Sequence, residues 1–382
     1  MKIANIIGAR PQFVKYFPVA KAVELHNTSS GARRITDVLI HTGQHYDYEM
    51  SKVFFDELGI RTPNYHLEVG SGTHGEQTGE AMKRVEKVLL DEAPDLVVVY
   101  GDTNSTLAGA LAAVKLHIPV AHIEAGLRSF NRKMPEEINR VLTDHVSSLL
   151  FCPNPRATEN LRMEGICADL NNGILMNSET LQNLDFLPER SVLNVGDVMY
   201  DVLLLAAEVT EDKSAVANRL ELSHKDYLLL TLHRAENTDD PTRFSEIVRF
   251  VNDISSGKTV VFPMHPRTRK VYAASSDKFH SAVQIISPVG YFDSLALMKH
   301  SGLVMTDSGG MQKEAFWLKV PCITLRNETE WVETVESGWN VLYSEYKGRH
   351  SPTDSINTVY GDGLAAQRIV GAIERYLWGK TS

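Results

Sequence analysis

Short apolar runs alternate with longer segments of mixed polarity along the first half of the chain. Each run is followed by a turn rich in glycine or polar residues and then by a stretch in which apolar residues recur with helical spacing; the runs are residues 2–7, 37–41, 95–100 and 119–123. Short, mostly apolar runs bounded by turns are typical of strands buried in a parallel sheet. The alternation therefore predicts consecutive strand–helix units.

The same alternation resumes in the second half, after a segment of different character. Residues 166–190 are polar, rich in asparagine and weakly periodic, and the later apolar runs are residues 227–232, 259–263, 285–286, 303–305 and 321–325. We predict an α/β protein of two Rossmann-like doubly wound domains that face a cleft. The N-terminal domain is expected to span residues 1–185 and the C-terminal domain residues 186–365. A C-terminal helix within residues 366–382 is expected to pack back on the N-terminal domain.

Length and composition fit this organisation. The 382 residues suffice for two domains, and 43% hydrophobic with 23% charged residues is ordinary for a globular protein. No apolar stretch reaches the length of a membrane span, and the first strand pattern follows Met1 directly, so we expect a cytoplasmic protein with no membrane partner. The net charge of −9 disfavours nucleic acid as a partner. Because the three cysteines lack CxxC spacing, no metal site is expected.

A Gly-Gly turn in the second half has the pattern of an anion site. Gly309 and Gly310 follow a short apolar run, and a helix pattern begins with them. Free amides at a helix start, from Ser308 onward, can bind a phosphate or diphosphate, and Glu314 would lie within reach of ligand hydroxyls beyond it. An ordinary turn capped by Asp307 or Ser308 explains the same pattern when it is taken alone.

The first strand–helix turn is a second candidate for phosphate. Gly8 permits a tight turn, Pro11 suits a helix start, and Arg10 and Lys15 place two cations beside it. The segment is not a GxGxxG fingerprint, so a dinucleotide is not expected. A solvated loop with incidental charges fits this segment equally well.

Acidic residues follow two neighbouring strand patterns and open a later helix. Asp102 and Glu124 each follow an apolar run, while Glu136 starts a helix on which Arg140 lies one turn later. The spacing of Glu136 and Arg140 alone indicates a surface ion pair. Because the carboxyl ends of parallel strands meet at one edge of a sheet, the three carboxylates together predict general acid–base chemistry.

Seven motifs, taken in order, resemble those of the non-hydrolysing UDP-N-acetylglucosamine 2-epimerases. The resemblance runs from residue 3 to about residue 345. Its motifs are Gly8-Ala-Arg-Pro11, Thr42-Gly-Gln-His45, Gly101-Asp-Thr103, His122-Ile-Glu-Ala-Gly-Leu-Arg128, Pro135-Glu-Glu-Ile-Asn-Arg140, Leu232-His-Arg-Ala-Glu-Asn237 and Thr306-Asp-Ser-Gly-Gly310. It implies a glycosyltransferase-B fold, a homodimer, and interconversion of UDP-N-acetylglucosamine and UDP-N-acetylmannosamine without a dissociable redox cofactor.

The resemblance also implies roles for individual residues. UDP leaves C1 of the sugar as a proton leaves C2, giving 2-acetamidoglucal, and re-addition on the other face inverts C2. The implied catalytic residues are Asp102, Glu124, Glu136 and His233. The implied substrate-binding residues are Arg10, Lys15, Arg140, His265, Ser308, Gly309, Gly310, Glu314 and Arg326.

Departures from the family pattern bear on regulation and substrate. Asp47 and Glu76 stand where allosterically activated members carry glutamine and arginine, so activation by a second substrate molecule is not expected. The connection over residues 168–188 is longer than is usual in the family. Residues 129–131 and 329–333 are similar to relatives that act on UDP-2,3-diacetamido-2,3-dideoxy-glucuronic acid, which is the alternative substrate.

Two readings from other functional classes stay open at this stage. A glycosyltransferase of the same fold would need an acceptor-binding element, and the sequence shows no such pattern. A non-catalytic sensor of nucleotide sugars would need the Gly-Gly turn but none of the carboxylates.

Overall fold

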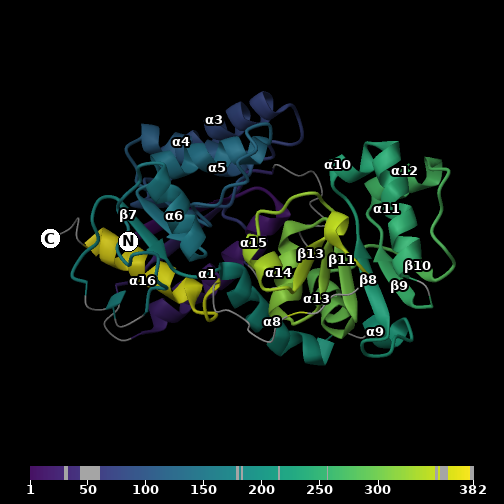
Figure 1. The fold of residues 1–382 in the computed structure, drawn as a ribbon. Coiled ribbons are helices and arrows are strands. Elements are labelled where there is room, and N and C mark those ends of the chain that lie inside the picture. The colour runs from purple at the N-terminus through teal and green to yellow at the C-terminus, as the bar shows by residue number, and fades with distance from the viewer. Residues whose placement is uncertain are drawn as a thin grey trace. The chain divides into compact units, whose positions relative to one another are not determined.

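The computed structural model describes residues 1–29, 33–43, 61–177, 180–181, 184–213, 216–255, 257–348, 352 and 360–378, without the side chains of Arg10 and of residues 207–213. The chain divides into two compact units. Residues 1–205 and 358–382 form the first unit, and residues 206–357 form the second (Figure 1). Each unit is built around its own parallel sheet, and each is described separately below.

The first unit contains a seven-stranded sheet in the order β3-β2-β1-β4-β5-β6-β7. All neighbouring pairs are parallel. The strands are β1 (Lys2–Ile7), β2 (Thr36–His41), β3 (Tyr65–His66), β4 (Leu96–Tyr100), β5 (Val120–Ile123), β6 (Leu149–Cys152) and β7 (Ser191–Asn194). The chain winds outward from β1 to β3 and then returns to β4 beside β1, so the winding direction reverses between β1 and β4. In open parallel sheets, ligands bind at the carboxyl ends of the strands that flank such a reversal.

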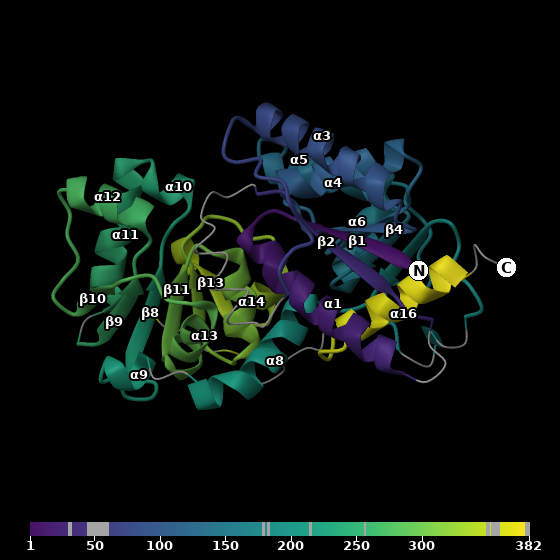
Figure 2. The same cartoon turned by 180° about the vertical axis from the view of Figure 1, so that it is seen from behind.

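Helices cover both faces of this sheet. The helices are α1 (Arg10–Thr28), α3 (His74–Glu92), α4 (Asn104–Lys115), α5 (Pro135–Val146), α6 (Pro155–Met163) and α16 (Ala365–Trp378). Figures 1 and 2 show α3, α4 and α5 side by side over one face, with α1 and α16 packed together on the opposite side. The core on the first of these faces lies between the strands and the apolar sides of α3 and α4. Burial on both faces explains why β4 is apolar throughout.

The second unit contains a six-stranded sheet in the order β10-β9-β8-β11-β12-β13, again with parallel neighbours. Its strands are β8 (Tyr227–Thr231), β9 (Thr259–Pro263), β10 (Val283–Ile286), β11 (Leu303–Thr306), β12 (Cys322–Thr324) and β13 (Asn340–Leu342). The main helices are α11 (Pro241–Ile254), α12 (Pro266–Ala274), α13 (Tyr291–His300) and α14 (Gly309–Trp317). Alternate residues of β8 enter two different core clusters, as expected for a strand covered on both faces. The winding direction reverses between β8 and β11, so this pair marks the corresponding edge of the second sheet.

Both units have the doubly wound parallel architecture that the alternating pattern predicts. The boundary between them differs in position from the sequence-based one at residues 185/186. Ser191–Asn194 pairs with β6 as the last strand of the first sheet, and α8 (Val198–Lys213) begins in the first unit. A strand of only four residues after a polar, asparagine-rich segment carries little periodic signal, which is why the sequence placed it beyond the boundary.

A buried carboxylate attaches the C-terminal helix to the rest of the first unit. The carboxylate of Asp201 accepts hydrogen bonds from the backbone N–H groups of Ala365 and Ala366, at 3.2 and 2.7 Å, at the start of α16. Burial raises the pKa of Asp201 to about 7, although these two hydrogen bonds act in the opposite direction. Since the folded-state pKa lies above the unfolded value of about 3.9, the folded protein holds this proton more tightly than the unfolded chain does. The resulting stability is fully present below about pH 4 and is lost as the pH rises through 7.

Replacement of Asp201 with asparagine is expected to flatten this pH dependence while leaving a side-chain oxygen for the amides of α16. Between pH 5 and pH 7 the wild-type protein should lose roughly 2 kcal/mol of stability relative to the Asp201→Asn variant. Urea unfolding of both proteins at the two pH values measures the difference. If the unfolding free energy of the two proteins depended on pH in the same way, the raised pKa of Asp201 would be contradicted.

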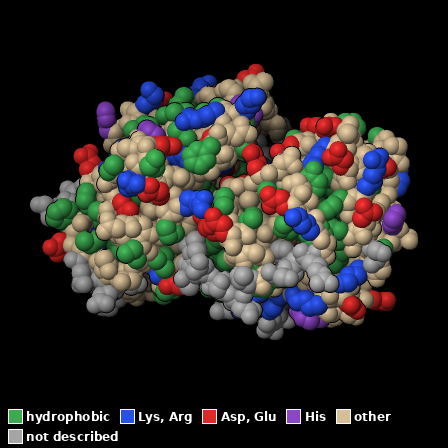
Figure 3. Space-filling model, in the orientation of Figure 1, with side chains coloured by type: hydrophobic (Ala, Val, Ile, Leu, Met, Phe, Trp, Pro, Cys, Tyr) green, Lys and Arg blue, Asp and Glu red, His purple; other side chains and the backbone are tan. Residues whose placement is uncertain are grey.

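On the face drawn in Figure 3, lysine and arginine side chains are interspersed with aspartate and glutamate. No helix in the described part of the chain has the length and apolar character needed to cross a membrane.

Candidate functional site

Lys15 and Glu124 form an ion pair at the point where the winding direction of the first sheet reverses. Lys15 lies in α1, which follows β1, and Glu124 is the first residue after β5; both side chains are mostly buried. The pair lies over Gly101, the first residue after β4. A β-carbon added to Gly101 would lie 3.2 Å from Lys15 Nζ and 3.3 Å from Glu124 Oε2. The structure therefore brings the ends of three neighbouring strands to one charged group.

Glu124 adopts a backbone conformation that non-glycine residues rarely use. Its φ is +73°, and the N–H groups of Glu124 and Ala125 both donate to the carbonyl of Phe151, at 3.1 and 3.0 Å. Residues held in the left-handed region cluster at functional sites, because the surrounding structure has to compensate for the strain. The two hydrogen bonds to one carbonyl provide part of that compensation and fix the direction of the Glu124 side chain.

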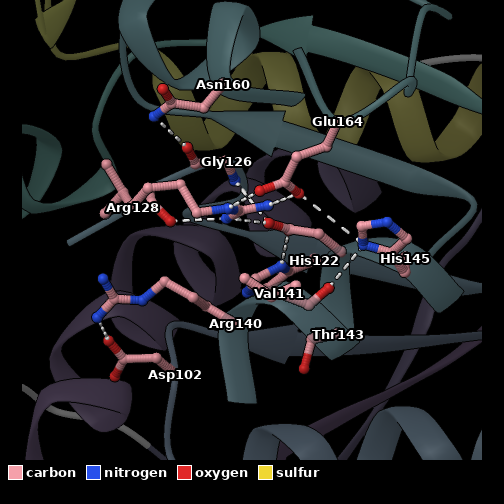
Figure 4. A network of polar contacts seen from close by, with 12 residues as sticks. Asp102, His122, Gly126, Arg128, Arg140, Val141, Thr143, His145, Asn160 and Glu164 are labelled. Carbon is pink, nitrogen blue, oxygen red and sulfur yellow. Dashed lines mark hydrogen bonds and ion pairs between the residues drawn. The ribbon is translucent and has the colours of Figure 1, made fainter. Parts of the chain in front are cut away.

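Asp102 forms an ion pair with Arg140 of α5 (Figure 4). The same guanidinium donates from Nη1 to Glu137 Oε2 at 3.2 Å. Glu137 is buried and also accepts hydrogen bonds from the backbone N–H groups of Ser129 and Phe130, at 2.9 and 3.0 Å. Arg140 is thereby held in one orientation, with one edge of its guanidinium directed at Asp102.

The partner of Arg140 differs from the one that the spacing indicated. The sequence placed Arg140 opposite Glu136, but Glu136 is exposed on the first turn of α5 and its buried neighbour Glu137 forms the ion pair. Both spacings, three and four residues, lie on one helix face, so periodicity cannot choose between them. Among the described residues, the structure joins Asp102 to Arg140 and Lys15 to Glu124, and it leaves Glu136 at the surface.

Two backbone amides of the turn after β1 are already paired within the protein. The backbone N–H groups of Gly8 and Ala9 donate to Gln12 Oε1, at 2.7 and 3.0 Å. Gln12 is buried, and its Nε2 donates to the carbonyl of Tyr100 at 2.8 Å, so it ties this turn to the end of β4. These two amides are therefore not available to an anion. The side chain of Arg10 lies outside the described part of the structure.

In the second unit the candidate residues follow four adjacent strands. His265 follows β9, His233 follows β8, Ser308 follows β11 and Arg326 follows β12. Because all these strands are parallel, the four positions share the carboxyl edge of the sheet. His265 is exposed, and its Nδ1 accepts a hydrogen bond from the N–H of Arg267 at 3.2 Å, so it caps α12.

A buried aspartate orients His233. Asp307 accepts hydrogen bonds from the backbone N–H groups of His233 and Arg234, at 2.9 and 2.8 Å, and its Oδ1 lies 3.2 Å from His233 Nδ1. Although burial by itself raises the pKa of Asp307, its hydrogen bonds and charge interaction with His233 outweigh burial and lower the pKa. The ionised carboxylate fixes the ring orientation of His233, which leaves Nε2 to face outward. From the sequence alone, Asp307 was considered only as a helix cap.

The two adjacent glycines at the start of α14 have different surroundings. A β-carbon on Gly309 would lie 2.6 Å from Glu330 Oε1, whereas on Gly310 it would meet only Ser308 Oγ at 3.9 Å. Neither glycine has a positive φ, so neither is required by an unusual backbone angle, and only Gly309 lacks room for a side chain within the protein. The Ser308 side chain makes no capping hydrogen bond. The open approach to the amides of this helix start is therefore at Gly310.

Two further candidate residues are held by neighbours in the same unit. Glu314 in α14 is buried, and its Oε1 accepts a hydrogen bond from the hydroxyl of Tyr291 at 3.1 Å. Arg326 donates to Glu330 at 2.8 Å and to Glu236 at 3.1 Å. Although burial lowers the pKa of Arg326, the charges of Glu330, Glu236 and Glu328 and the hydrogen bond to Glu330 together outweigh burial, so the pKa is raised. The sequence assigned no role to Tyr291, Glu236 or Glu330, because no pattern marks them as partners of Glu314 and Arg326.

No cluster of three or more potential metal ligands occurs among the described side chains. Cys152 and Cys322 are buried thiols and Cys167 is an exposed one. The candidate groups described in the two units are carboxylates with lysine or arginine partners, an oriented histidine and an open helix start.

Two doubly wound α/β units, one with ion-paired carboxylates and one with an open Gly-Gly helix start, define an enzyme of the glycosyltransferase-B fold class. Similarity to known proteins identifies the family within this fold class. The family profile described as UDP-N-acetylglucosamine 2-epimerase matches residues 28–374. A UDP-N-acetylglucosamine 2-epimerase homolog of Methanococcus maripaludis is 49% identical over 97% of this chain and 98% of its own.

Two other relatives differ in what their names say of their substrates. The UDP-2,3-diacetamido-2,3-dideoxy-D-glucuronate 2-epimerase of Pseudomonas aeruginosa is 47% identical, with the same coverage. The crystal structure of the Methanocaldococcus jannaschii UDP-GlcNAc 2-epimerase in complex with UDP-GlcNAc and UDP is 42% identical, has a TM-score of 0.81, and covers 98% of this chain and 99% of its own. The chain belongs to the UDP-N-acetylglucosamine 2-epimerase family, whose members are isomerases.

Proposed function

We propose that the protein interconverts UDP-N-acetylglucosamine and UDP-N-acetylmannosamine by eliminating UDP and adding it back through 2-acetamidoglucal. The observation that carries the proposal is the pair of ion-paired carboxylates, Asp102 with Arg140 and Glu124 with Lys15, at adjacent strand ends in a chain of this family. Relatives that share over 40% of its residues are named as 2-epimerases of UDP-sugars.

The chemistry requires groups of this kind. C2 of the sugar is not adjacent to a carbonyl, so removal of its proton is slow unless a bond to a good leaving group breaks at the same time. Loss of the diphosphate from C1 supplies that leaving group, and a carboxylate near C2 accepts the proton. Inversion requires a second acid to return a proton to the opposite face. Asp102, Glu124 and Glu136 are proposed for these roles.

The leaving diphosphate requires compensation of its charge. His233, oriented by Asp307, presents one ring nitrogen outward, and the helix start at Gly310 offers amides with an open approach. We assign the phosphates to Ser308, Gly309 and Gly310, the ribose hydroxyls to Glu314, and supporting contacts to Arg10, His265 and Arg326. A buried carboxylate such as Glu314 suits paired hydroxyls because it can accept a hydrogen bond at each oxygen.

Incubation with UDP-N-acetylglucosamine in deuterated water tests the proposed function. An epimerase working by proton exchange at C2 is expected to place deuterium at C2 of recovered substrate and product. A glycosyltransferase of the same fold would move the sugar without exchanging this hydrogen, and a sensor would leave the substrate unchanged. Absence of deuterium at C2 after prolonged incubation, with UDP-N-acetylglucosamine and also with the alternative substrate UDP-2,3-diacetamido-2,3-dideoxy-glucuronic acid, would contradict the proposal.

The contact between Tyr291 and Glu314 leads to a prediction about the affinity for UDP. Glu314→Ala is expected to weaken UDP binding about 10²-fold, because the ribose loses a charged acceptor worth roughly 1.5–3 kcal/mol. Tyr291→Phe, which keeps the ring and removes only the hydroxyl bound to Glu314, should weaken it by a smaller factor, about threefold. Calorimetric titration with UDP measures both. Unchanged affinity in Glu314→Ala would place the ribose elsewhere.

The Pseudomonas relative makes the diacetamido uronate a specific second candidate substrate. Its C6 carboxylate would require a cationic partner, since an unpaired carboxylate is costly to bury. Arg132 and Lys133 are exposed in the loop before α5 and are candidates for that partner, while His45, a third candidate, lies outside the described residues. We expect UDP-N-acetylglucosamine to be preferred. A kcat/KM at least about 10²-fold higher for the uronate, equivalent to roughly 2.7 kcal/mol, would reverse this assignment.

We also propose that the protein works in the cytoplasm as a homodimer and supplies precursors for surface polysaccharides. These proposals rest on the resemblance to the family. Light scattering of the purified protein measures its mass in solution. A monomer at micromolar concentration would contradict the dimer.

A further inference from the structure

A buried ionic network lies beneath the carboxylate-bearing strand ends of the first unit (Figure 4). At its centre is Asp144 of α5, which is fully buried. Asp144 Oδ1 accepts a hydrogen bond from His122 Nδ1 at 2.7 Å, and Oδ2 accepts from the N–H of Gly126 at 3.1 Å and from Arg128 Nη1 at 2.7 Å. One carboxylate therefore holds the chain two residues before Glu124 and two residues after it.

The charge of Asp144 is balanced within the network. Arg128 continues to Glu164 through two parallel hydrogen bonds of 2.8 and 2.7 Å. Burial alone would raise the pKa of Asp144, but His122 and Arg128 outweigh burial and lower the pKa. Asp144 is therefore an ionised group that can only accept hydrogen bonds, so Nδ1 of His122 must donate to it.

The other ring nitrogen of His122 reaches the neighbouring strand end. His122 Nε2 lies 2.7 Å from the carbonyl oxygen of Gly101, which also can only accept. This carbonyl belongs to the peptide group that joins Gly101 to Asp102. The N–H of Gly101 in turn donates to the carbonyl of Ile123 at 3.0 Å. The ring of His122 thus bridges β5 to the first peptide after β4 and donates from both nitrogens.

We propose that His122, held by Asp144, is a positioning residue that fixes the Gly101–Asp102 peptide and thereby places Asp102 and Glu124 for proton transfer. This proposal rests on the proposed epimerase function. Gly101 is adjacent to both acidic residues, because a β-carbon on it would lie against the Lys15–Glu124 pair and its carbonyl group begins the link to Asp102. A displacement of about 1 Å at such a point can reduce a rate 10²-fold without any change in the residues that react.

Two substitutions of His122 separate positioning from stabilisation of the fold. The amide nitrogen of asparagine can occupy the place of Nδ1 and that of glutamine the place of Nε2. His122→Asn therefore keeps the bond to Asp144 and loses the one to Gly101, and His122→Gln does the reverse. A bond to a buried ionised carboxylate contributes more to stability than a bond to a neutral carbonyl.

The two variants are expected to rank in opposite order by thermal stability and by kcat. By thermal unfolding, His122→Asn should be at least as stable as His122→Gln. By turnover, His122→Gln should keep kcat within about fivefold of the wild type, while His122→Asn should lose about 10²-fold in kcat, with KM and UDP affinity within threefold in both. Loss of kcat in the same order as loss of stability, or wild-type kcat in His122→Asn, would overturn the proposal.

A measurement on the unaltered protein covers the case in which His122→Asn does not fold. NMR of protein with ¹⁵N-labelled histidine, with the His122 signals assigned from their absence in His122→Gln, should show a hydrogen on Nε2 of His122. An unprotonated Nε2 would overturn the proposal, because the ring could not then donate to Gly101.

His145→Gln is the matched control. His145 Nδ1 lies 4.0 Å from Glu164 at the other end of the same network, and its side chain is about half exposed. The same substitution at this position should leave kcat unchanged. Wild-type protein without epimerase activity would contradict the proposed function itself, whereas an active wild type with a fully active His122→Asn variant contradicts only the positioning role.

Discussion

Replacement of Glu124 by glutamine, or of Asp102 by asparagine, is expected to reduce kcat by about 10²–10⁴-fold while UDP affinity stays near the wild-type value. Removal of one positioned acid or base typically costs a factor of this size. UDP affinity should be preserved because the proposed nucleotide contacts other than Arg10 belong to the second unit. Each substitution keeps the shape of the side chain and removes its charge, so the effect reports on proton transfer and on the ion pair with Lys15 or Arg140.

Glu136, the third proposed acid, can be compared with an exposed glutamate of the same unit. Glu136 is exposed at the start of α5, yet the family resemblance assigns it a catalytic role, and Glu136→Gln is expected to reduce kcat within the same range. Glu159→Gln serves as the control, because Glu159 is an exposed glutamate paired with Arg162 at the surface of the same unit. Turnover is followed by NMR of the two UDP-sugars. Near-normal epimerisation in all three acid variants would refute the catalytic assignment.

The sequence predicted the fold best where strands are buried on both faces. The run 95–100 is apolar at nearly every position because β4 lies in the middle of its sheet, and a continuous apolar run bounded by turns is hard to mistake. At the end of the sheet the signal disappears. β7 is the last strand of its sheet, spans four residues and follows a polar segment, so its place in the first unit follows from long-range pairing with β6. Local pattern carries no information on such pairing.

For the candidate site, the sequence located the strand ends but not the contacts between them. Asp102 and Glu124 were expected at one edge, and their neighbours in space, Arg140 and Lys15, were also named. Which acid contacts which cation depends on burial, and here Glu137 displaced Glu136 as the helical partner of Arg140. The roles of the residues that hold the reactive groups in place were not predicted. These residues are Gln12, His122, Asp144, Tyr291 and Asp307. Gln12 bonds to Tyr100, His122 to Asp144, Tyr291 to Glu314 and Asp307 to His233, across 88, 22, 23 and 74 residues of sequence.

Three of these residues, Gln12, His122 and Asp307, satisfy polar groups where a strand ends and its hydrogen-bonding ladder stops. A buried strand end leaves backbone groups without partners, and each unpaired group costs free energy. Gln12 supplies acceptors and donors at the ends of β1 and β4, and Asp307 accepts from two amides at the end of β8. The same groups that complete the backbone hydrogen bonding therefore also fix the side chains proposed to react.

A substitution at the Gly-Gly helix start is expected to produce the second large effect, on UDP binding. Gly310→Val is expected to weaken UDP binding about 10²-fold, the loss of roughly 2.7 kcal/mol that follows when a charged ligand loses one or two hydrogen bonds. The space beside Gly310 holds only Ser308 Oγ within 4 Å, so a valine there disturbs little in the unliganded protein and instead occupies the approach of a phosphate to the helix amides.

Two other glycines show whether the effect belongs to this position. Gly79→Val places the same side chain in open space on α3, far along the sequence from the proposed nucleotide contacts, and should leave UDP affinity unchanged. Gly309→Ala forces a β-carbon to within 2.6 Å of Glu330 Oε1, so it should lower thermal stability even in the absence of UDP. Calorimetric titration and thermal unfolding of the three variants separate these outcomes. Undiminished UDP affinity in Gly310→Val would mean that the diphosphate does not bind at this helix start, because no ligand held by these amides could tolerate a valine in its path.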